Sequence, residues 1–562
     1  MKVGIVPDEI NMVSVQSVFQ VLEQTLARRH EIVRRPLEYF YVSSSKQKAM
    51  CEEFVRQCDL IAGRIDEKVL AAREQFERRP PLIGFLMGTM SRGAADMANW
   101  SRYLKATDIV VGNCDGDVEI TRKFFTNAQI RKLSFSFDES LFCPADEQER
   151  KAIRAELRFK PTDKILLYSG RITLEKNVHT LLKMFSVLQD LVPDLHLVVA
   201  GDPYVIQFQA MGVYPLSSTG TLMKLMKKLR IKKEQVHFIG SRNSAQLRDL
   251  YAMADVVVNL TLHHDENFGL AQVEALACGT PVVGTSWGGL KDTINHGKAG
   301  YQISTVVTNA GVKLNWWEAI NRIISLLEDE STLARFRESC RECALEVSSQ
   351  ALYTETLESI VADCERLSHG PSEPLKLTEF AREYWQECQP NEFSPPSFQR
   401  GQKSFEMYKE LIAPYTGSTE NTIANEEPWR PDQLLLLATP VRFEHNLIKL
   451  DDPIFPLEFV VPEANQETVE GVLAVLRKQP VISFESLQRT VAAGTEKSFE
   501  TTLRWMIETG ILLRTRLMDA SIEPDMIGEQ MGQPVFAIQP VDYATDVIVI
   551  RQMTSPHTYA AT

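Results

Sequence analysis

The segment that decides the fold runs from Val256 to Gly284 and reads VVVNLTLHHDENFGLAQVEALACGTPVVG. It predicts an apolar strand at 256–260, a polar loop, a helix at 270–277 and a second apolar strand at 281–284. Strands that are apolar on both faces and are joined through a helix are typical of a parallel sheet covered by helices on both sides. The segment therefore predicts one strand–helix–strand unit of an α/β fold.

The same alternation extends from the start of the chain to about residue 365. Two series of apolar strands separated by amphipathic helices predict two doubly wound domains, over 1–150 and 151–345. A helix within 346–370 is expected to return to the first domain. The other expected strands are 2–6, 60–62, 81–86, 108–111, 164–169, 195–200 and 236–239, and the other expected helices include 15–29, 176–190 and 244–253.

The pattern changes after residue 370. Residues 371–462 are rich in Pro, Asn, Gln and Glu and have poor periodicity, which indicates either a linker or an irregular wrap. Residues 463–562 begin with three expected helices, then Gly510 and a strand at 511–513. That order predicts a mainly helical, winged-helix-like module followed by a tail. The three expected helices are 468–478, 483–491 and 497–509.

Charge is distributed unevenly along the 562 residues. The net charge is −13, and residues 371–562 hold 16 basic and 28 acidic side chains, or −12 of that total. An acidic extension repels phosphate backbones and favours basic or polar protein surfaces. Its third helix carries as many acids as bases, whereas DNA recognition needs a basic helix. We therefore expect no nucleic-acid partner; a protein or peptide contact surface, a structural cap and simple solubility stay open.

Composition and cysteine usage indicate where the protein works. With 44% hydrophobic and 24% charged residues, the chain is neither disordered nor fibrous. No apolar run approaches the roughly 18 residues that cross a bilayer, and Asp8 and Glu9 lie where a signal peptide needs an apolar core. The nine cysteines lie mostly singly, so we expect a cytoplasmic protein. Cys340 and Cys343 are expected to be two free thiols on a helix and not a metal site.

Cationic side chains follow the strand at 164–169. Ser169 and Gly170 lead into Arg171, and a helix is expected to start near residue 174 with Lys176 in its first turn. The carboxyl end of a parallel strand and the N-terminus of the next helix both face the crevice where such folds bind ligands. Arg171 and Lys176 therefore suit a diphosphate, although a solvated first turn explains the same residues.

Two carboxylates accompany the next loop and helix. Glu266 is expected in the loop and Glu274 more than one turn into the helix, while Gly269 lets a ligand approach the backbone. One carboxylate can accept sugar hydroxyls and the other can reach a ribose. The alternative is a capped amphipathic helix with Glu274 in solvent. His263 and His264 are adjacent on an extended segment and point to opposite faces, so we expect no metal there.

Taken in order and spacing, these motifs resemble the retaining GT-B glycosyltransferases of family four. The resemblance is specific over 160–305, weaker over 1–365, and does not extend to the acidic C-terminal extension. Its motifs are Ser169-Gly-Arg with Leu174-Glu-Lys, Phe238-Ile-Gly, Arg242-Asn-Ser-Ala-Gln-Leu-Arg-Asp-Leu-Tyr, Glu266-Asn-Phe-Gly-Leu with Glu274, Cys278-Gly-Thr-Pro, Trp287-Gly-Gly-Leu-Lys and His296-Gly-Lys-Ala-Gly-Tyr.

The resemblance implies two Rossmann-like domains, the first facing the acceptor and the second holding a nucleotide-diphosphate sugar. It implies transfer of a hexose from a UDP- or GDP-sugar to an acceptor hydroxyl with retention, without a metal or other cofactor. Arg171, Lys176 and Glu266 would be catalytic. Donor-binding residues would be Gly170, Arg171, Lys176, Gly240, Glu266, Asn267, Phe268, Gly269, Leu270 and Glu274.

The acceptor side departs from that family. The first strand is followed by Val6-Pro-Asp-Glu-Ile-Asn, which lacks the family's Gly-rich loop, and a usual histidine is replaced within Leu86-Met-Gly-Thr-Met. Asp8 and Glu9 are the acceptor-side candidates, or else a helix cap. Peptide, protein, glycan and lipid acceptors stay open. The alternative function is a non-catalytic GT-B subunit that docks a partner through its acidic extension.

Overall fold

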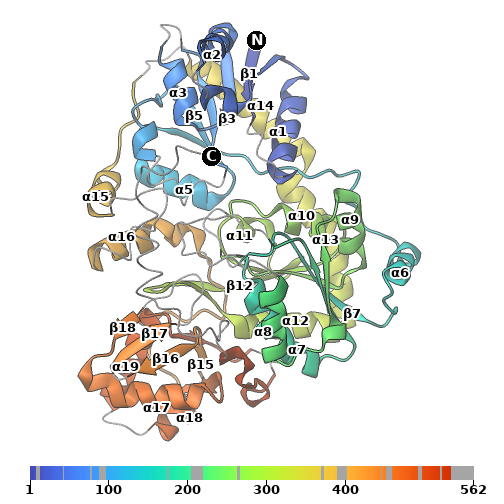
Figure 1. Ribbon diagram of the computed structural model, residues 1–562, viewed down its shortest axis with the longest axis vertical. Coiled ribbons are helices and arrows are strands. Elements are labelled where there is room, and N and C mark those ends of the chain that lie inside the picture. The colour runs from blue at the N-terminus through green and yellow to red at the C-terminus, as the bar shows by residue number, and fades with distance from the viewer. Residues whose placement is uncertain are drawn as a thin grey trace.

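The computed structural model describes residues 1–7, 13–41, 44–75, 79–87, 97–173, 176–203, 219–262, 266–368, 373–388, 402–444, 446–450, 458–491, 496–518 and 522–532. Two six-stranded parallel sheets form the body of the protein, one in the upper half of Figure 1 and one at the lower right. The C-terminal extension lies along the other side and ends in a small module at the lower left. The two doubly wound domains predicted from the sequence are therefore present.

The first sheet has the order β2-β1-β3-β4-β5-β6. Near the end of the two-domain body, α14 (Gln350–Leu367) returns to it, and its Leu357 and Ile360 share a core with Val3 and Ile5. The elements of this domain are β1 (Lys2–Val6), α1 (Val13–Leu26), β2 (Glu31–Arg34), α2 (Ser45–Gln57), β3 (Leu60–Arg64), α3 (Glu67–Arg73), β4 (Leu82–Phe85), β5 (Ile109–Gly112), α5 (Asp115–Phe124) and β6 (Gln129–Lys132).

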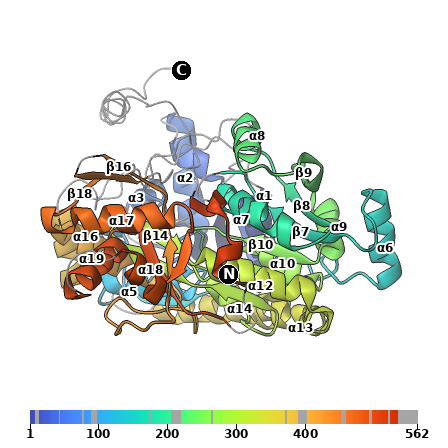
Figure 2. The same ribbon diagram turned by 90° about the horizontal axis from the view of Figure 1, so that it is seen from below.

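The second sheet has the order β12-β11-β10-β7-β8-β9, with helices on both faces (Figure 2). Its elements are α6 (Glu147–Glu156), β7 (Lys164–Ser169), α7 (Val178–Leu191), β8 (Leu195–Ala200), α8 (Thr219–Lys228), β9 (Val236–Gly240), α9 (Ser244–Met253), β10 (Val256–Asn259), α10 (Leu270–Ala277), β11 (Val282–Thr285), α11 (Leu290–Thr293), β12 (Gly300–Ile303), α12 (Trp316–Glu328) and α13 (Glu330–Ser348). A hairpin, β13 (Thr305–Thr308) with β14 (Gly311–Leu314), extends from β12.

Three parallel strands and one helix start differ from the sequence predictions. β2, β6 and β12 were not predicted; all three lie at sheet edges, where strands need no continuous apolar run. Helix α7 begins at Val178 and not near residue 174, because Asn177 takes a left-handed conformation with φ 61° immediately before it. Lys176 therefore lies in the preceding turn and not in the first turn of the helix.

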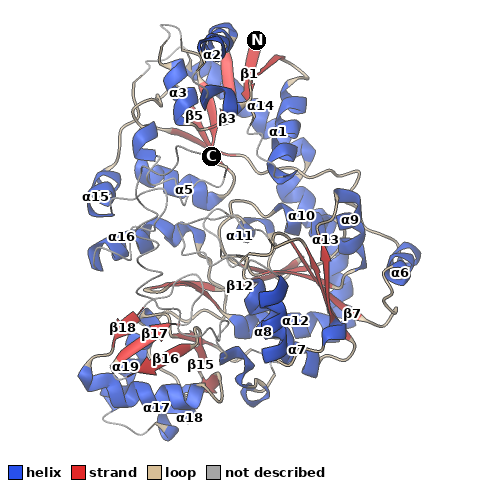
Figure 3. Cartoon of the chain, viewed as in Figure 1, coloured by secondary structure: helices blue, strands red, loops and turns tan. Residues whose placement is uncertain are grey.

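The extension is more regular than the sequence indicated. The stretch 371–462, predicted to be irregular, contains α15 (Glu379–Cys388), α16 (Gln402–Ile412) and four strands (Figure 3). The helices and strand expected after it are found close to their predicted positions. The strands and later elements are β15 (Leu434–Leu437), β16 (Val441–Glu444), β17 (Leu447–Leu450), β18 (Glu458–Val460), α17 (Gln466–Leu476), β19 (Val481–Ser483), α18 (Phe484–Thr490), α19 (Glu496–Glu508) and β20 (Leu512–Thr515).

Packing makes the extension part of the body. The two small sheets are antiparallel, with the orders β19-β15-β20 and β16-β17-β18. Tyr384, Tyr415 and Leu434 lie in the same continuous core as Phe124 of the first domain and Trp317 of the second. Burying such side chains contributes about 1.5–3 kcal/mol each. The extension therefore packs against both domains.

Each domain is fixed by a buried aspartate that directly precedes a central strand. Asp108 precedes β5, accepts the amide of Leu82 at 2.9 Å and pairs with Arg73 at 2.6 Å. Asp255 precedes β10, accepts the amide of Ile165 at 2.8 Å and pairs with Arg154 at 2.9 Å. In each case one carboxylate joins the starts of two adjacent strands to a helix. No helix within the described ranges is long and apolar enough to cross a membrane.

Candidate functional site

The predicted site residues lie at the carboxyl edge of the second sheet. β7 leads into Gly170 and Arg171, and β9 ends at Gly240. The backbone carbonyl of Arg171 accepts a hydrogen bond from the hydroxyl of Tyr168 at 2.6 Å, which fixes the loop after β7. In a parallel sheet this edge is where ligands bind. The structure thus gathers the expected phosphate-side residues at one edge.

Lys176 and Glu266 form an ion pair between two loops at this edge. The ammonium of Lys176 bonds the Oε2 atom of Glu266, and the side chains are only 17% and 13% exposed. Asn177, next to Lys176, donates to the carbonyl of Leu260 at 3.2 Å and ties the same two loops together. Two of the three predicted catalytic residues are therefore in direct contact.

Glu274 lies in a hydrogen-bonded chain and not in open solvent. The hydroxyl of Tyr251 donates to Oε2 of Glu274 at 3.3 Å and contacts the Ser169 hydroxyl at 2.8 Å. Burial raises the pKa of Glu274 to about 8, and the Tyr251 hydroxyl bond partly offsets this. The solvent-exposed alternative for Glu274 is wrong.

The loop before α10 connects the two domains. Gly269 has φ 89°, a left-handed conformation that favours glycine, and a Cβ there would displace the Leu290 side chain, whose Cδ2 atom would lie 2.4 Å away. The Nδ2 atom of Asn267 donates to Oδ1 of Asn113 at 2.8 Å, and Asn113 directly follows β5 of the first domain. Sequence reasoning missed Asn113, although its place after a predicted strand end was visible.

Not every predicted donor-binding side chain reaches the polar edge. Phe268 is 2% exposed and packs edge-on against Phe135 with ring centroids 5.4 Å apart, so only its backbone can touch a donor. Leu270 is partly buried against the same core. Asp8 and Glu9, the acceptor-side candidates, lie outside the described residues, as do His263 and His264. Among the residues described, no cluster of His, Cys, Asp and Glu could hold a metal ion.

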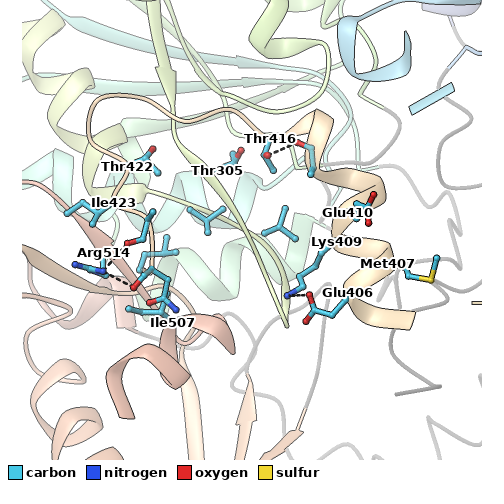
Figure 4. Close-up of a pocket in the computed structure, with 16 residues that line it drawn as sticks. Thr305, Glu406, Met407, Lys409, Glu410, Thr416, Thr422, Ile423, Ile507 and Arg514 are labelled. Atoms are coloured by element: carbon cyan, nitrogen blue, oxygen red, sulfur yellow. Dashed lines mark hydrogen bonds and ion pairs between the residues drawn. The ribbon is translucent and has the colours of Figure 1, made fainter. Parts of the chain in front are cut away.

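A separate cavity of about 670 Å³ lies away from this edge (Figure 4). It is formed by β13, α16, the segment after α16 and β20, and it includes Thr305, Lys409 and Arg514. None of the predicted donor-binding residues lines it. Arg514 is occupied within the extension, where it donates to the carbonyls of Ala424 at 2.9 Å and Asn425 at 3.2 Å.

The similarity to a known protein family lies in the part of the chain that contains the second sheet. Residues 149–342 match the family model described as glycosyl transferases group 1. The chain is 36% identical over 163 residues to a D-inositol 3-phosphate glycosyltransferase of Mycolicibacterium gilvum, which is 29% of this chain and 33% of that protein. It is 28% identical over 300 residues, 52% of this chain and 71% of the relative, to an N-acetyl-alpha-D-glucosaminyl L-malate synthase of Bacillus anthracis. The chain thus spans about a third of the first relative's length.

Solved structures share the two-sheet architecture. Anabaena Alr3699/HepE in complex with UDP matches with a TM-score of 0.51 at 16% identity, covering 64% of this chain and 99% of that one. A glycosyltransferase from Rickettsia africae matches with a TM-score of 0.51 at 14% identity, covering 66% and 99%. At such identities the likeness concerns the fold.

Proposed function

We propose, from the match of residues 149–342 to the family model of glycosyl transferases group 1, that the protein transfers a hexose-type sugar from a UDP-sugar to an acceptor hydroxyl with retention of configuration. The observation that carries the proposal is the Lys176–Glu266 ion pair at the carboxyl edge of the second sheet, inside the matched segment. The UDP held by the fold relative from Anabaena favours UDP over GDP as the nucleotide.

The donor's diphosphate is assigned to Arg171 and Lys176. Lys176 carries three N–H donors, so it can keep its bond to Glu266 and still bond a phosphate oxygen. Two cations facing a leaving diphosphate stabilise the negative charge that develops as the bond to the sugar breaks. Glu266, held beside Lys176, is assigned to the sugar hydroxyls.

The ribose is assigned to Glu274, whose carboxylate accepts hydroxyl hydrogen bonds once it is ionised. In the transfer step, the bond between the anomeric carbon and the β-phosphate oxygen breaks and a bond from the acceptor oxygen forms on the same face. The acceptor's proton passes to the departing phosphate. This assignment uses no bound metal, since the charge is met by Arg171 and Lys176.

The acceptor is proposed from charge alone. An extension with a net charge of −12 favours a basic peptide or protein over an anionic acceptor. Incubation with UDP-[14C]glucose and basic Ser/Thr peptides, with neutral and acidic peptides of the same length as controls, tests it. Label incorporation that is equal for all three peptides, or absent from all, would reject a basic peptide acceptor.

The function itself is tested by calorimetric titration of the full chain with UDP, GDP, UDP-glucose and UDP-N-acetylglucosamine, followed by an assay of UDP release. We expect UDP and one UDP-sugar to bind and GDP to bind more weakly. Tight binding of GDP alone would reject the UDP assignment. Failure of every nucleotide to bind would reject the enzyme and favour the non-catalytic, partner-docking subunit.

A further inference from the structure

The extension crosses the two domains through a short segment that we call the strap, residues 413–421. It follows α16, which lies between α5 and the C-terminal module (Figure 1). The strap begins with a short helix, η5 (Ala413–Tyr415), that packs against α5. It is therefore placed where the first domain, the second domain and the extension meet.

Tyr415 joins the strap to the first domain. Its side chain is fully buried, and its hydroxyl donates a hydrogen bond to Oδ1 of Asp117 near the start of α5. The other carboxylate oxygen of Asp117 accepts the amide of Asn113 at 3.0 Å. Asn113 is the residue that receives the bond from Asn267 in the donor loop. One buried carboxylate thus links the strap to the interdomain contact.

The same residue holds a turn of the second domain. The carbonyl of Tyr415 accepts the amide of Gly288 at 2.8 Å, and its ring packs against Trp287 with centroids 5.6 Å apart. Lys291 donates to the carbonyls of Pro414 and Thr416, the latter at 3.3 Å. The turn from Trp287 to Lys291 is therefore bonded to the strap at both ends.

This turn supports the backbone of Glu266. The amide of Gly289 donates to the carbonyl of Glu266 at 2.8 Å. A Cβ at Gly288 would lie 2.2 Å from that carbonyl oxygen, so the two backbones touch without space for a side chain. Interiors packed this closely transmit small displacements, so a shift of the turn moves Glu266.

The far end of the strap is anchored to the second domain by Glu318. This fully buried carboxylate accepts the hydroxyl of Thr419 at 2.7 Å and the amide group of Asn421 at 2.9 Å. Its second oxygen accepts the amide of Ser304 at 3.0 Å. Nearby, Thr305 and Thr416 lie together on one wall of the separate cavity (Figure 4). The strap is thus held near its start by the contacts of Tyr415 and near its end by those of Thr419 and Asn421.

We propose that Tyr415 is a positioning residue for the donor sugar. Tyr415 holds the turn at Gly288 and Gly289, and this turn holds the backbone of Glu266. The Tyr415 hydroxyl also holds the first domain in place through its bond to Asp117. The inference rests on the proposed function, because it takes Glu266 as the carboxylate that meets the sugar. The inference gives the acidic extension a role in the reaction. The extension lies outside residues 149–342, the segment that matches the group 1 family model.

The test compares Tyr415→Ala with Tyr384→Ala in the full chain. Tyr384 is a matched control, because it is a buried tyrosine of the extension that packs on Phe124 of the same helix α5, away from the turn. UDP reports only the nucleotide contacts, whereas UDP-glucose and UDP-N-acetylglucosamine also report the sugar contact. We expect Tyr415→Ala to bind UDP within about twofold of wild type and the UDP-sugar about tenfold more weakly. The reason is that the displaced Glu266 carboxylate loses its charged hydrogen bond to the sugar.

Hydrogen exchange gives a readout independent of catalysis. Peptides covering 266–270 and 286–291 should exchange several-fold faster in Tyr415→Ala than in wild type, and should exchange at the wild-type rate in Tyr384→Ala. If either alanine variant fails to fold, Tyr415→Leu and Tyr384→Leu replace the pair, because leucine keeps most of the apolar volume. Equal losses for UDP and UDP-sugar, or unchanged exchange at the turn, would overturn the positioning role. A wild-type protein that binds no UDP-sugar would instead reject the proposed function.

Discussion

Lys176 and Glu266 lie 90 residues apart in the chain and form a mostly buried ion pair at the carboxyl edge of the second sheet. Two oppositely charged side chains held there meet the two needs of a nucleotide-sugar site, a cation for the phosphates and an acceptor for the sugar hydroxyls. Breaking such a pair by removing one partner leaves the other charge uncompensated. A substitution of either residue therefore also affects the other, and the two roles are separated by comparing UDP with a UDP-sugar as the ligand.

Lys176→Ala should weaken UDP and UDP-glucose alike, by about ten- to a hundred-fold, because a charged hydrogen bond to phosphate contributes about 1.5–3 kcal/mol. Glu266→Gln should spare UDP and weaken UDP-glucose. Calorimetry on both variants measures this split. Lys151→Ala is the control, since Lys151 pairs with Glu147 at 2.6 Å on the exposed face of helix α6. Equal weakening by Lys151→Ala would contradict the assignment.

Glu274 should make UDP binding depend on pH. Burial raises the pKa of Glu274 to about 8 in the free protein, so the carboxylate that accepts ribose hydroxyls becomes more abundant between pH 7 and 9. Binding that selects the ionised form strengthens as pH rises, by at most about tenfold per unit below that pKa. Titrations of wild type and Glu274→Gln from pH 6.5 to 9 measure this, and the variant corrects for ionisation of UDP itself. Parallel profiles would disprove the ribose role.

The elements of one strand–helix–strand unit are the part of the fold that can be predicted from the sequence. Local apolar patterning decides the unit at Val256–Asn259 and Leu270–Ala277, so these elements lie where they were predicted. Lys176 was misplaced because the left-handed Asn177 delays the helix, and asparagine adopts that conformation only occasionally. Tyr415 could not be found at all, since its partner Asp117 is 298 residues away.

Tyr415→Phe should destabilise the protein more at pH 8 than at pH 5. Burial raises the pKa of Asp117 to about 6, and the Tyr415 hydroxyl opposes that rise. Because the folded-state pKa exceeds the usual 3.8, Asp117 lowers stability as pH rises through this window. Losing the hydroxyl raises the pKa further and extends the loss to higher pH. Thermal unfolding at both pH values measures it; Tyr384→Phe should show a loss independent of pH, and equal losses in Tyr415→Phe would contradict the Asp117 link.

Asp255→Asn should destabilise the second domain by about 3–5 kcal/mol, because removing one partner of a buried ion pair leaves the others uncompensated. Although burial raises the pKa of Asp255, Arg154, Arg150 and Arg337 hold it below its ordinary value. Its contribution is therefore present above the unfolded-state pKa of about 3.8 and is lost only as pH falls through the lower folded-state value. Calorimetric unfolding between pH 5 and 8 should show a constant loss of unfolding free energy, while UDP affinity of the folded fraction stays unchanged.

Asp108→Asn, at the equivalent position before β5, should give a similar deficit in the unfolding free energy of the first domain. A deficit that disappears at pH 5, or a weakened UDP affinity, would contradict a purely structural role for Asp255.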